Sequence, residues 1–256
     1  MKKILLLFVC ASFSFPLWAF DHTHQSYAKV LAAVVVDQGP RAQVNYAWLK
    51  EHVFLLDQYL AELQSISLKD YSQWSRNQQM AFLINAYNAF TLKLIVNAYP
   101  NLNSIKDLGG LFSSPWQNDF FTLLGQIHNL DSIEHQWLRT RFAEPKVHFA
   151  IVCASQGCPA LNQAPYIADD LPAQLQSAKT RFLKDTTRNR YDAPTKTLYL
   201  SKIFAWFATD FIKAAGSVEA FVADSISQNP MDRQVIQQQG VKIIYLDYDW
   251  SLNKIP

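Results

Sequence analysis

The segment 151–161, IVCASQGCPAL, carries two cysteines, Cys153 and Cys158, with Gly157 before the second one and Pro159 after it. Proline is favoured at the first position of a helix, so this pattern predicts that Cys158 caps a helical turn. Free backbone N–H groups and the positive end of the helix dipole would stabilise a thiolate there, and the thiolate is the attacking form of cysteine. We therefore expect Cys158 to be a catalytic nucleophile.

Two other interpretations of the cysteine pair are open at this stage. A Cys153–Cys158 disulfide requires the two Cα atoms to lie within about 7 Å, and the loop between them is short. Alternatively, both are unreactive thiols, and Cys153 in particular is typical of a buried strand residue.

A nucleophilic cysteine needs a base and a group that orients the base. His128 and His135 lie on separate predicted elements that could fold back, and His135 is the candidate base because Glu134 stands beside it in sequence. The candidate orienting group is Glu134 or an Asn. His148 lies near the start of the apolar run 146–153, which predicts a central strand. Five strand residues of about 3.3 Å each would place His148 ~16 Å from the end of that strand, an awkward distance from Cys158.

A long apolar helix is predicted over 76–99, where Ser75 and Gln78 have the spacing of a capping box. Asn85 and Asn88 lie on a side of this helix that should be buried, and an unpaired buried amide costs roughly 1–3 kcal/mol. These two side chains are therefore expected either to tie down neighbouring loops or to line a polar cavity.

The remaining periodicity predicts a helix-rich α+β domain packed on a small β-sheet. The expected helices cover 24–36, 45–64, 130–141 (with Asp131 and Glu134 as a capping box), 169–187, 202–213, 217–227 and 231–239. The expected strands form hairpins over 119–128 and 190–200, and a last strand covers 241–246. No repeat or flexible linker divides the chain, so we expect a single domain over 20–256, with an N-terminal helical part over 20–69 and a core over 70–253.

The first 19 residues resemble a secretory signal peptide, with Lys2 and Lys3 before a short apolar run and Ala19 at its end. We therefore expect a periplasmic or secreted protein that has no stable membrane insertion after cleavage. The leader contains Cys10, so the mature chain keeps two cysteines, too few for a disulfide-dense scaffold.

Composition limits the partners that the mature chain could bind. Without Lys2 and Lys3, basic and acidic residues are equal in number. The mature chain therefore has no net positive charge that would attract nucleic acid or anionic lipid. No phosphate-binding loop or zinc signature occurs, and we expect no metal and no cofactor. A small-molecule or peptide ligand stays an open prediction, and the sequence does not indicate an oligomeric state.

Five segments in order resemble the DUF547 family of exported bacterial and plant proteins, and together they cover about residues 70–253. They are FLINAYNAFTLKLI, LDSIEHQWLR, VHFAIVCASQGCPAL, LSKIFAWFATDF and YLDYDWSLN. The resemblance implies a distant similarity to papain-like and transglutaminase-like cysteine hydrolases. It also implies that one constellation contains Asn85, Asn88, Glu134, His135, His148, Cys153 and Cys158.

These observations lead to two functional hypotheses besides a plain structural protein with a Cys153–Cys158 bridge. The first is a cysteine-hydrolase-like or thiol-dependent enzyme, which would act by acyl transfer, amide hydrolysis or thiol chemistry with Cys158 as nucleophile. The second is a non-catalytic periplasmic binding module in which Cys153 and Cys158 are structural.

Overall fold

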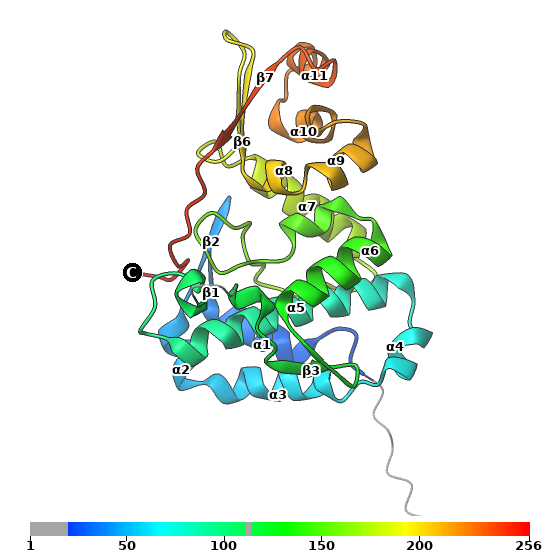
Figure 1. The fold of residues 1–256 in the computed structure, drawn as a ribbon, viewed down its shortest axis with the longest axis vertical. Coiled ribbons are helices and arrows are strands. Elements are labelled where there is room, and N and C mark those ends of the chain that lie inside the picture. Colours follow the sequence, from blue (N-terminus) through cyan, green and yellow to red (C-terminus); the bar gives the residue numbers. More distant parts are fainter. Residues whose placement is uncertain (1–19, 111–113) are drawn as a thin grey trace, which may run out of the picture.

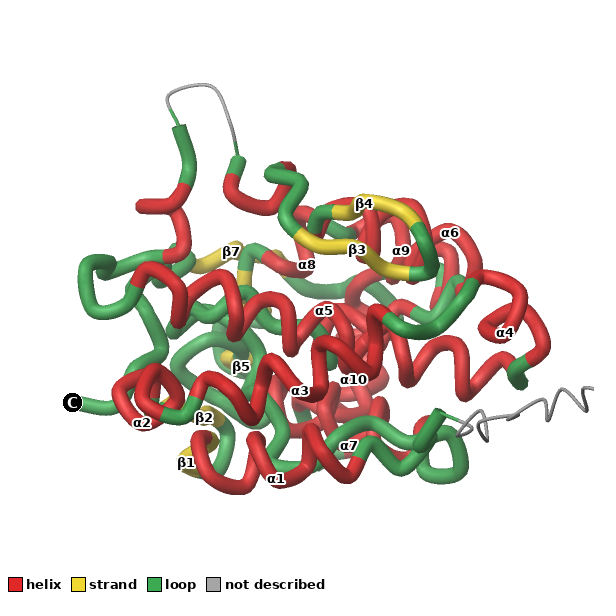
Figure 2. Tube along the Cα trace, turned by 90° about the horizontal axis from the view of Figure 1, so that it is seen from below, coloured by secondary structure: helices red, strands yellow, loops and turns green. Residues whose placement is uncertain are grey.

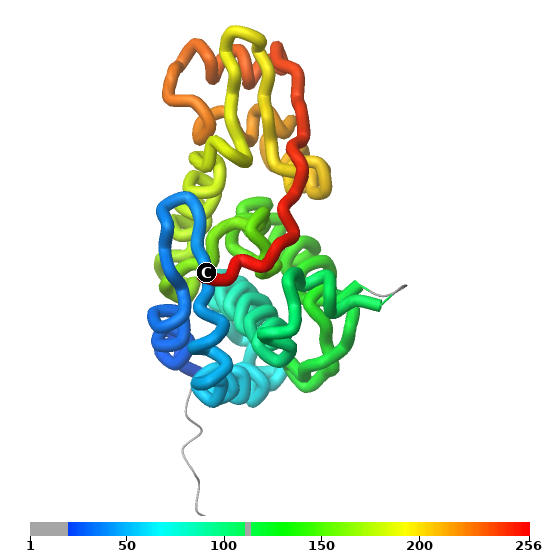
Figure 3. The backbone as a smooth tube through the Cα atoms, turned by 90° about the vertical axis from the view of Figure 1, so that its left-hand side faces the viewer, coloured from blue at the N-terminus to red at the C-terminus, as the bar shows by residue number. Residues whose placement is uncertain are grey.

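The computed structural model describes residues 20–110 and 114–256, so the predicted leader lies outside the described residues. Within the described part the chain is largely helical and carries three small sheets, which confirms the predicted α+β class. Figures 1 and 3 show an elongated molecule with two lobes. None of the described helices is long and apolar enough to cross a bilayer.

The N-terminal lobe, in the lower half of Figure 1, packs helices around one long central helix. Its α-helices are α1 (Gln25–Val34), α2 (Tyr46–Glu51), α3 (Val53–Gln64), α4 (Leu68–Gln73), α5 (Arg76–Ala98) and α6 (Arg139–Phe142). Shorter helical turns are η1 (Ile105–Leu108), η2 (Pro115–Gln117), the π-helical η3 (Ser132–Leu138) and η4 (Pro145–Phe149). Two antiparallel hairpins complete the lobe, β1 (Val35–Gln38) with β2 (Arg41–Val44), and β3 (Phe121–Leu123) with β4 (Gln126–His128).

Helix α5 organises this lobe, and its predicted start is confirmed. The Ser75 hydroxyl accepts from the Gln78 backbone, while the Gln78 side chain accepts from the Ser75 N–H, which is the capping box expected from the sequence. Nearly every side chain from Met80 to Val96 is buried. Helix α5 packs against α2, α3 and η3, and Figure 2 shows α3 running beside it.

The C-terminal lobe places helices beside a three-stranded sheet. The helices are α7 (Leu171–Leu183), α8 (Ile203–Trp206), α9 (Ala208–Ala215), α10 (Val218–Ile226) and α11 (Pro230–Gln237). The strands are β5 (Arg190–Asp192), β6 (Thr197–Ser201) and β7 (Lys242–Leu246), in the order β5-β6-β7. Strand β6 pairs antiparallel with β5 and parallel with β7, so the predicted hairpin and last strand are both confirmed.

Several local predictions are wrong. The expected helices 45–64 and 202–213 are each divided, into α2 and α3 and into α8 and α9. The run 146–153 forms the turn of η4 and then irregular chain, because Pro145 begins a 3-10 turn that the Glu144 side chain caps. The first helix ends at Val34, and the β-branched residues that follow it enter a hairpin. Asp131 lies within the helical stretch before η3 and makes no cap hydrogen bond, so the predicted capping box with Glu134 is absent.

Each lobe has its own hydrophobic core. The larger cluster extends from Tyr27 to Leu175 and includes Leu252, whereas the smaller one joins Phe149 to apolar side chains of 178–236. After β7 the chain returns to the N-terminal lobe, as the red segment of Figure 3 shows. We call residues 247–254 the return segment. It meets the N-terminal lobe at the bridges Ser155–Leu252 and Val44–Lys254.

Candidate functional site

A cavity of about 170 Å³ is lined by residues from both lobes. Five of the seven residues predicted from the sequence line it: Glu134, His135, His148, Cys153 and Cys158. Aromatic side chains form much of the remaining wall, namely Tyr87, Trp116, Trp206, Phe207, Tyr248 and Trp250. The arrangement combines ionisable groups, a sulfur pair and an apolar wall.

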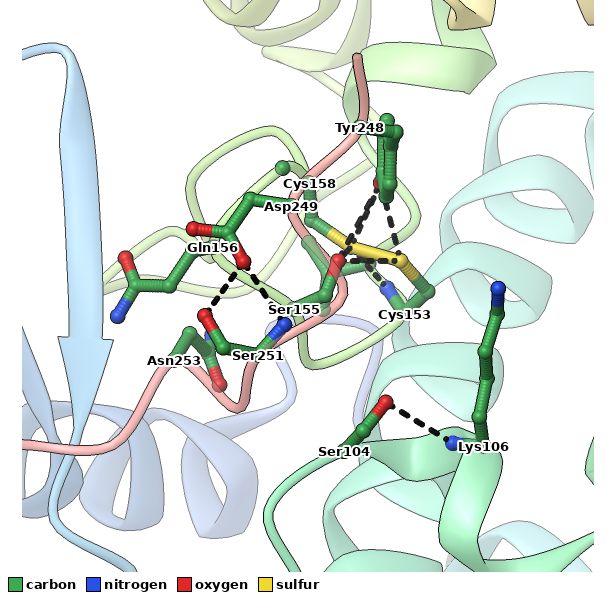
Figure 4. Close-up of a disulfide and its surroundings, with 12 residues drawn as sticks. Ser104, Lys106, Cys153, Ser155, Gln156, Cys158, Tyr248, Asp249, Ser251 and Asn253 are labelled. Atoms are coloured by element: carbon green, nitrogen blue, oxygen red, sulfur yellow. Dashed lines mark hydrogen bonds between the residues drawn. A yellow bond between two sulfur atoms is a disulfide. The ribbon is translucent and has the colours of Figure 1, made fainter.

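Cys153 and Cys158 are joined by a disulfide, with Cα atoms 6.1 Å apart (Figure 4). Cys158 is buried, whereas Cys153 is partly exposed. The predicted helix at Cys158 is absent, because the chain makes a turn from Ser155 and continues without regular structure to α7. The helix-dipole argument for a Cys158 thiolate therefore does not apply, and a thiolate there would depend on other hydrogen-bond donors.

Hydrogen-bond donors nevertheless converge on the disulfide. The backbone N–H of Cys153 donates to Sγ of Cys158 at 2.9 Å. The hydroxyls of Ser155 and Tyr248 lie 3.2–3.4 Å from both sulfurs, which can only accept because disulfide sulfurs carry no hydrogen. Each hydroxyl has one hydrogen to give, and that of Ser155 also reaches the Tyr248 oxygen at 3.4 Å. Burial raises the pKa of the Tyr248 phenol, so this hydroxyl stays protonated near neutrality.

The return segment holds the cysteine loop from one side. Backbone N–H groups of Gln156 and Gly157 donate to the carbonyls of Ser251 and Asp249, both at 2.8 Å. Gly157 approaches this segment so closely that an added Cβ would lie 2.8 Å from Cε1 of Tyr248. Gly157 is therefore required for close contact with Tyr248, the residue that donates to the sulfurs.

Arg188 also holds this loop. Its guanidinium donates to the carbonyl of Cys158 and, at 3.4 Å, to that of Gly157. It also forms an ion pair with Asp185 at 2.8 Å. Burial opposes ionisation of Asp185, but hydrogen bonds from Thr187 and Arg41 hold its pKa at about 2. The loop therefore rests on a buried, paired cation.

Glu134, on η3, is a buried carboxyl at the cavity wall. Its Oε2 accepts from the Tyr87 hydroxyl at 3.3 Å, and its Oε1 lies 4.0 Å from Nδ1 of His148. Burial, reinforced by the charge of Asp131, raises the pKa of Glu134 to about 7. A carboxyl that titrates near neutrality is suited to general acid–base chemistry.

His148 reaches this cavity from η4, and the expectation that strand geometry would keep it away is wrong because no strand is present. Its Nε2 lies 2.8 Å from Oδ2 of Asp210, whose carboxylate also accepts from Arg139. The ring stacks on Phe207 with centroids 3.9 Å apart. Burial lowers the pKa of His148, although the Asp210 carboxylate opposes that change.

His135, the predicted base, is held differently. Its Nδ1 lies 3.0 Å from Nη1 of Arg139, which can only donate, so that nitrogen is already an acceptor. Its Nε2 lies 3.7 Å from Asp131, and the side chain is 41% exposed. Glu134 does not orient it, because adjacent helical residues point in different directions.

Asn85 and Asn88 lie outside the cavity lining. Asn85 donates to the carbonyl of Tyr166 and accepts from its N–H, at 2.7 and 3.0 Å. Asn88 donates to the carbonyl of Ala150 and accepts from the N–H of Val152, both at 2.9 Å. Both amides thus tie down neighbouring chain, and Asn88 does so directly before Cys153.

Sequence reasoning assigned no role to Ser155, Arg188, Asp210 or Tyr248. Asp210 and Tyr248 lie within LSKIFAWFATDF and YLDYDWSLN, so the resemblance contained a signal for them. Ser155 lies inside the segment 151–161, and Arg188 lies outside all five segments that resemble the family. In the described part of the chain, no group of three or more His, Cys, Asp or Glu side chains could hold a metal ion.

Comparison with known proteins identifies one family. Residues 71–183 match the family described as "Protein of unknown function, DUF547". The matched range contains α5, Glu134, His148 and both cysteines, whereas Asp210 and Tyr248 lie outside it. No curated protein and no solved structure matches the chain.

Proposed function

We propose that this protein is an exported thiol-dependent enzyme in which Cys153 and Cys158 form a redox-active pair. The observation that carries the proposal is the convergence of the Cys153 N–H, the Ser155 hydroxyl and the Tyr248 hydroxyl on a sulfur at the cavity wall. Such donors stabilise a thiolate, and a more stable thiolate leaves faster in disulfide exchange. The leader-like N-terminus supports an oxidising compartment, where disulfides persist.

The accessibility of the two sulfurs gives the reaction a direction. Cys153 is the more exposed, so the thiolate of a substrate attacks its Sγ. A bond forms between the substrate sulfur and Sγ of Cys153, the Cys153–Cys158 bond breaks, and the electron pair passes to Sγ of Cys158. The Cys158 thiolate is then the nucleophile that can re-form the bond and expel the substrate. A second substrate thiol can instead release a substrate disulfide and leave both protein cysteines reduced.

The aromatic wall favours the second hypothesis, in which the same cavity binds a small-molecule or peptide ligand and the disulfide is structural. The two hypotheses differ in whether the disulfide exchanges in the folded protein. Structural disulfides have reduction potentials below about −300 mV, so the glutathione pool hardly reduces them.

The deciding experiment equilibrates the mature folded protein with mixtures of reduced and oxidised glutathione, followed by alkylation and mass spectrometry. A redox-active pair is expected to be reduced within the range of these buffers without denaturant. In the Cys158→Ser variant glutathione should remain attached to Cys153, whereas Cys153→Ser should carry much less. A disulfide that opens only after unfolding would contradict the enzyme and leave the binding module.

A further inference from the structure

We propose that Glu134 and His148 share one proton and together accept the proton of the incoming thiol, with Asp210 as the positioning residue for His148. This inference rests on the proposed function for its role in exchange. The shared proton itself is a property of the oxidised protein and can be tested alone.

The hydrogen bonds of His148 define its tautomer. Because the Asp210 carboxylate can only accept, Nε2 of His148 carries the hydrogen that it donates over 2.8 Å. In the neutral ring Nδ1 is then a bare acceptor, and this buried atom has no hydrogen-bond partner among residues 20–110 and 114–256. Oε1 of Glu134 lies 4.0 Å from this nitrogen. A protonated Glu134 therefore faces a vacant lone pair.

Packing keeps the imidazole in this orientation. The His148 side chain is only 1% exposed, stacks on Phe207 and meets the edge of Phe211 with centroids 5.6 Å apart. Arg139 donates to both carboxylate oxygens of Asp210, at 2.6 and 3.1 Å. It therefore holds the Asp210 carboxylate in the position from which that group orients the His148 ring. The ring cannot turn without breaking a charge-assisted hydrogen bond.

The charges around the pair favour one proton rather than none or two, because Asp131 and Asp210 oppose a bare Glu134 carboxylate, while Arg139 and His135 oppose an imidazolium beside a protonated Glu134. Glu134 faces Tyr87 from α5, His148 from η4, Asp210 from α9, and Asp131, His135 and Arg139 from its own helical stretch. In the doubly charged state, the carboxylate and the imidazolium attract each other, but burial removes the hydration of both ions. The doubly neutral state, carboxylic acid with imidazole, carries the same single proton, so either arrangement leaves one proton on the pair.

The proton balance of exchange is then closed within the cavity. The substrate thiol gives its proton to the ionised Glu134, the resulting thiolate attacks Sγ of Cys153, and the electron pair of the broken bond moves to Sγ of Cys158. In this state the pair's own proton is already on Nδ1 of His148, and the imidazolium is stabilised by the Asp210 carboxylate, which itself stays ionised. The pair therefore holds two protons until Glu134 gives one to a departing thiolate.

Histidine ¹⁵N NMR of the oxidised protein across pH 5–9 tests the shared proton directly. In the wild type the Nδ1 resonance of His148 is expected to follow a coupled titration with two steps. Glu134→Gln should leave a single step at lower pH, because the neutral amide cannot stabilise the imidazolium. The exposed Glu51→Gln is the matched control and should not alter the titration. A His148 titration that is the same in Glu134→Gln and wild type would overturn the inference.

Exchange kinetics with a small thiol test the role in catalysis. The exchange rate constant is first corrected for the fraction of the small thiol that is ionised at each pH. Near pH 7 the corrected rate constant of Glu134→Gln should be at least tenfold below that of the wild type, and it should no longer vary with pH. Asp210→Asn should lower the rate similarly while the reduction potential of the pair stays unchanged. Absence of exchange in the wild type would overturn the proposed function, and a coupled NMR titration would still support the shared proton. Normal exchange with an unaltered pH profile in Glu134→Gln would overturn the catalytic role.

Discussion

Oε2 of Glu134 accepts a hydrogen bond of 3.3 Å from the hydroxyl of Tyr87, in a buried setting that disfavours its charge. Burial raises the pKa of Glu134 from its usual 4.5 to about 7. Between these two values the folded protein holds a proton that the unfolded chain has released. Stability should therefore fall as pH rises through this interval and change no further above it through this group.

Glu134→Gln should remove this pH dependence. The amide oxygen can still accept from Tyr87, but no charge is buried, so the variant should be more stable than wild type at pH 8 by up to ~3 kcal/mol. At pH 4.5 the two proteins should differ little. Urea denaturation at both pH values measures the difference, and an equal effect of the substitution at both would contradict this origin of the shift.

Reduction of the disulfide should weaken the fold without abolishing it. Cys153 and Cys158 are separated by five positions in sequence, and closing so short a loop in the unfolded chain is worth about 2 kcal/mol. Arg188 and the return segment continue to hold the loop after reduction. Denaturation with and without reductant should give the same dependence on urea and a lower midpoint. Cooperative unfolding on reduction alone would show that the disulfide is indispensable.

The sequence was sufficient where the physical signal was local. Ser75 and Gln78 are three residues apart, and their capping box forms as predicted. The hairpin at Gly125 needed only a turn residue between two apolar runs, and it is present. The expectation that Glu134, His148 and Cys153 lie together came instead from the family resemblance, and the three residues line one cavity.

The sequence was insufficient where position depended on distant contacts. The run 146–153 is apolar whether it forms a buried strand or a buried turn, and periodicity alone cannot distinguish them. Phe149, within that run, joins the smaller core, which residues more than 25 positions later complete. Likewise, Tyr248 reaches Cys158 across 90 positions of sequence, so no local pattern could indicate the donors that replace the expected helix.

Asn88 and Asn85 offer a matched pair of substitutions. Each amide pairs with one backbone carbonyl and one backbone N–H, so either change to alanine should cost roughly 1–3 kcal/mol for each backbone group left unpaired. Only Asn88 binds the chain directly before Cys153, at Val152. Asn88→Ala should therefore also change the rate at which a small thiol reduces the disulfide, whereas Asn85→Ala should not. Equal reduction rates in the two variants would separate Asn88 from the sulfur site.

Gly157→Ala should separate the return segment from the cysteine loop. The new Cβ would lie 2.8 Å from Cε1 of Tyr248 and 2.9 Å from the carbonyl oxygen of Asp249, so one of these must move. Overpacking of this kind costs typically about 1–3 kcal/mol, and displacement of Tyr248 would also remove its hydroxyl from Sγ of Cys158. Tyr248→Phe is the control that removes only the hydroxyl and keeps the ring in place. Both variants should slow disulfide reduction by a small thiol, because the Cys158 thiolate loses a donor, but Gly157→Ala should show the larger loss of stability in urea. Wild-type stability in Gly157→Ala would mean that the contact between the loop and the return segment is looser than the structure gives it.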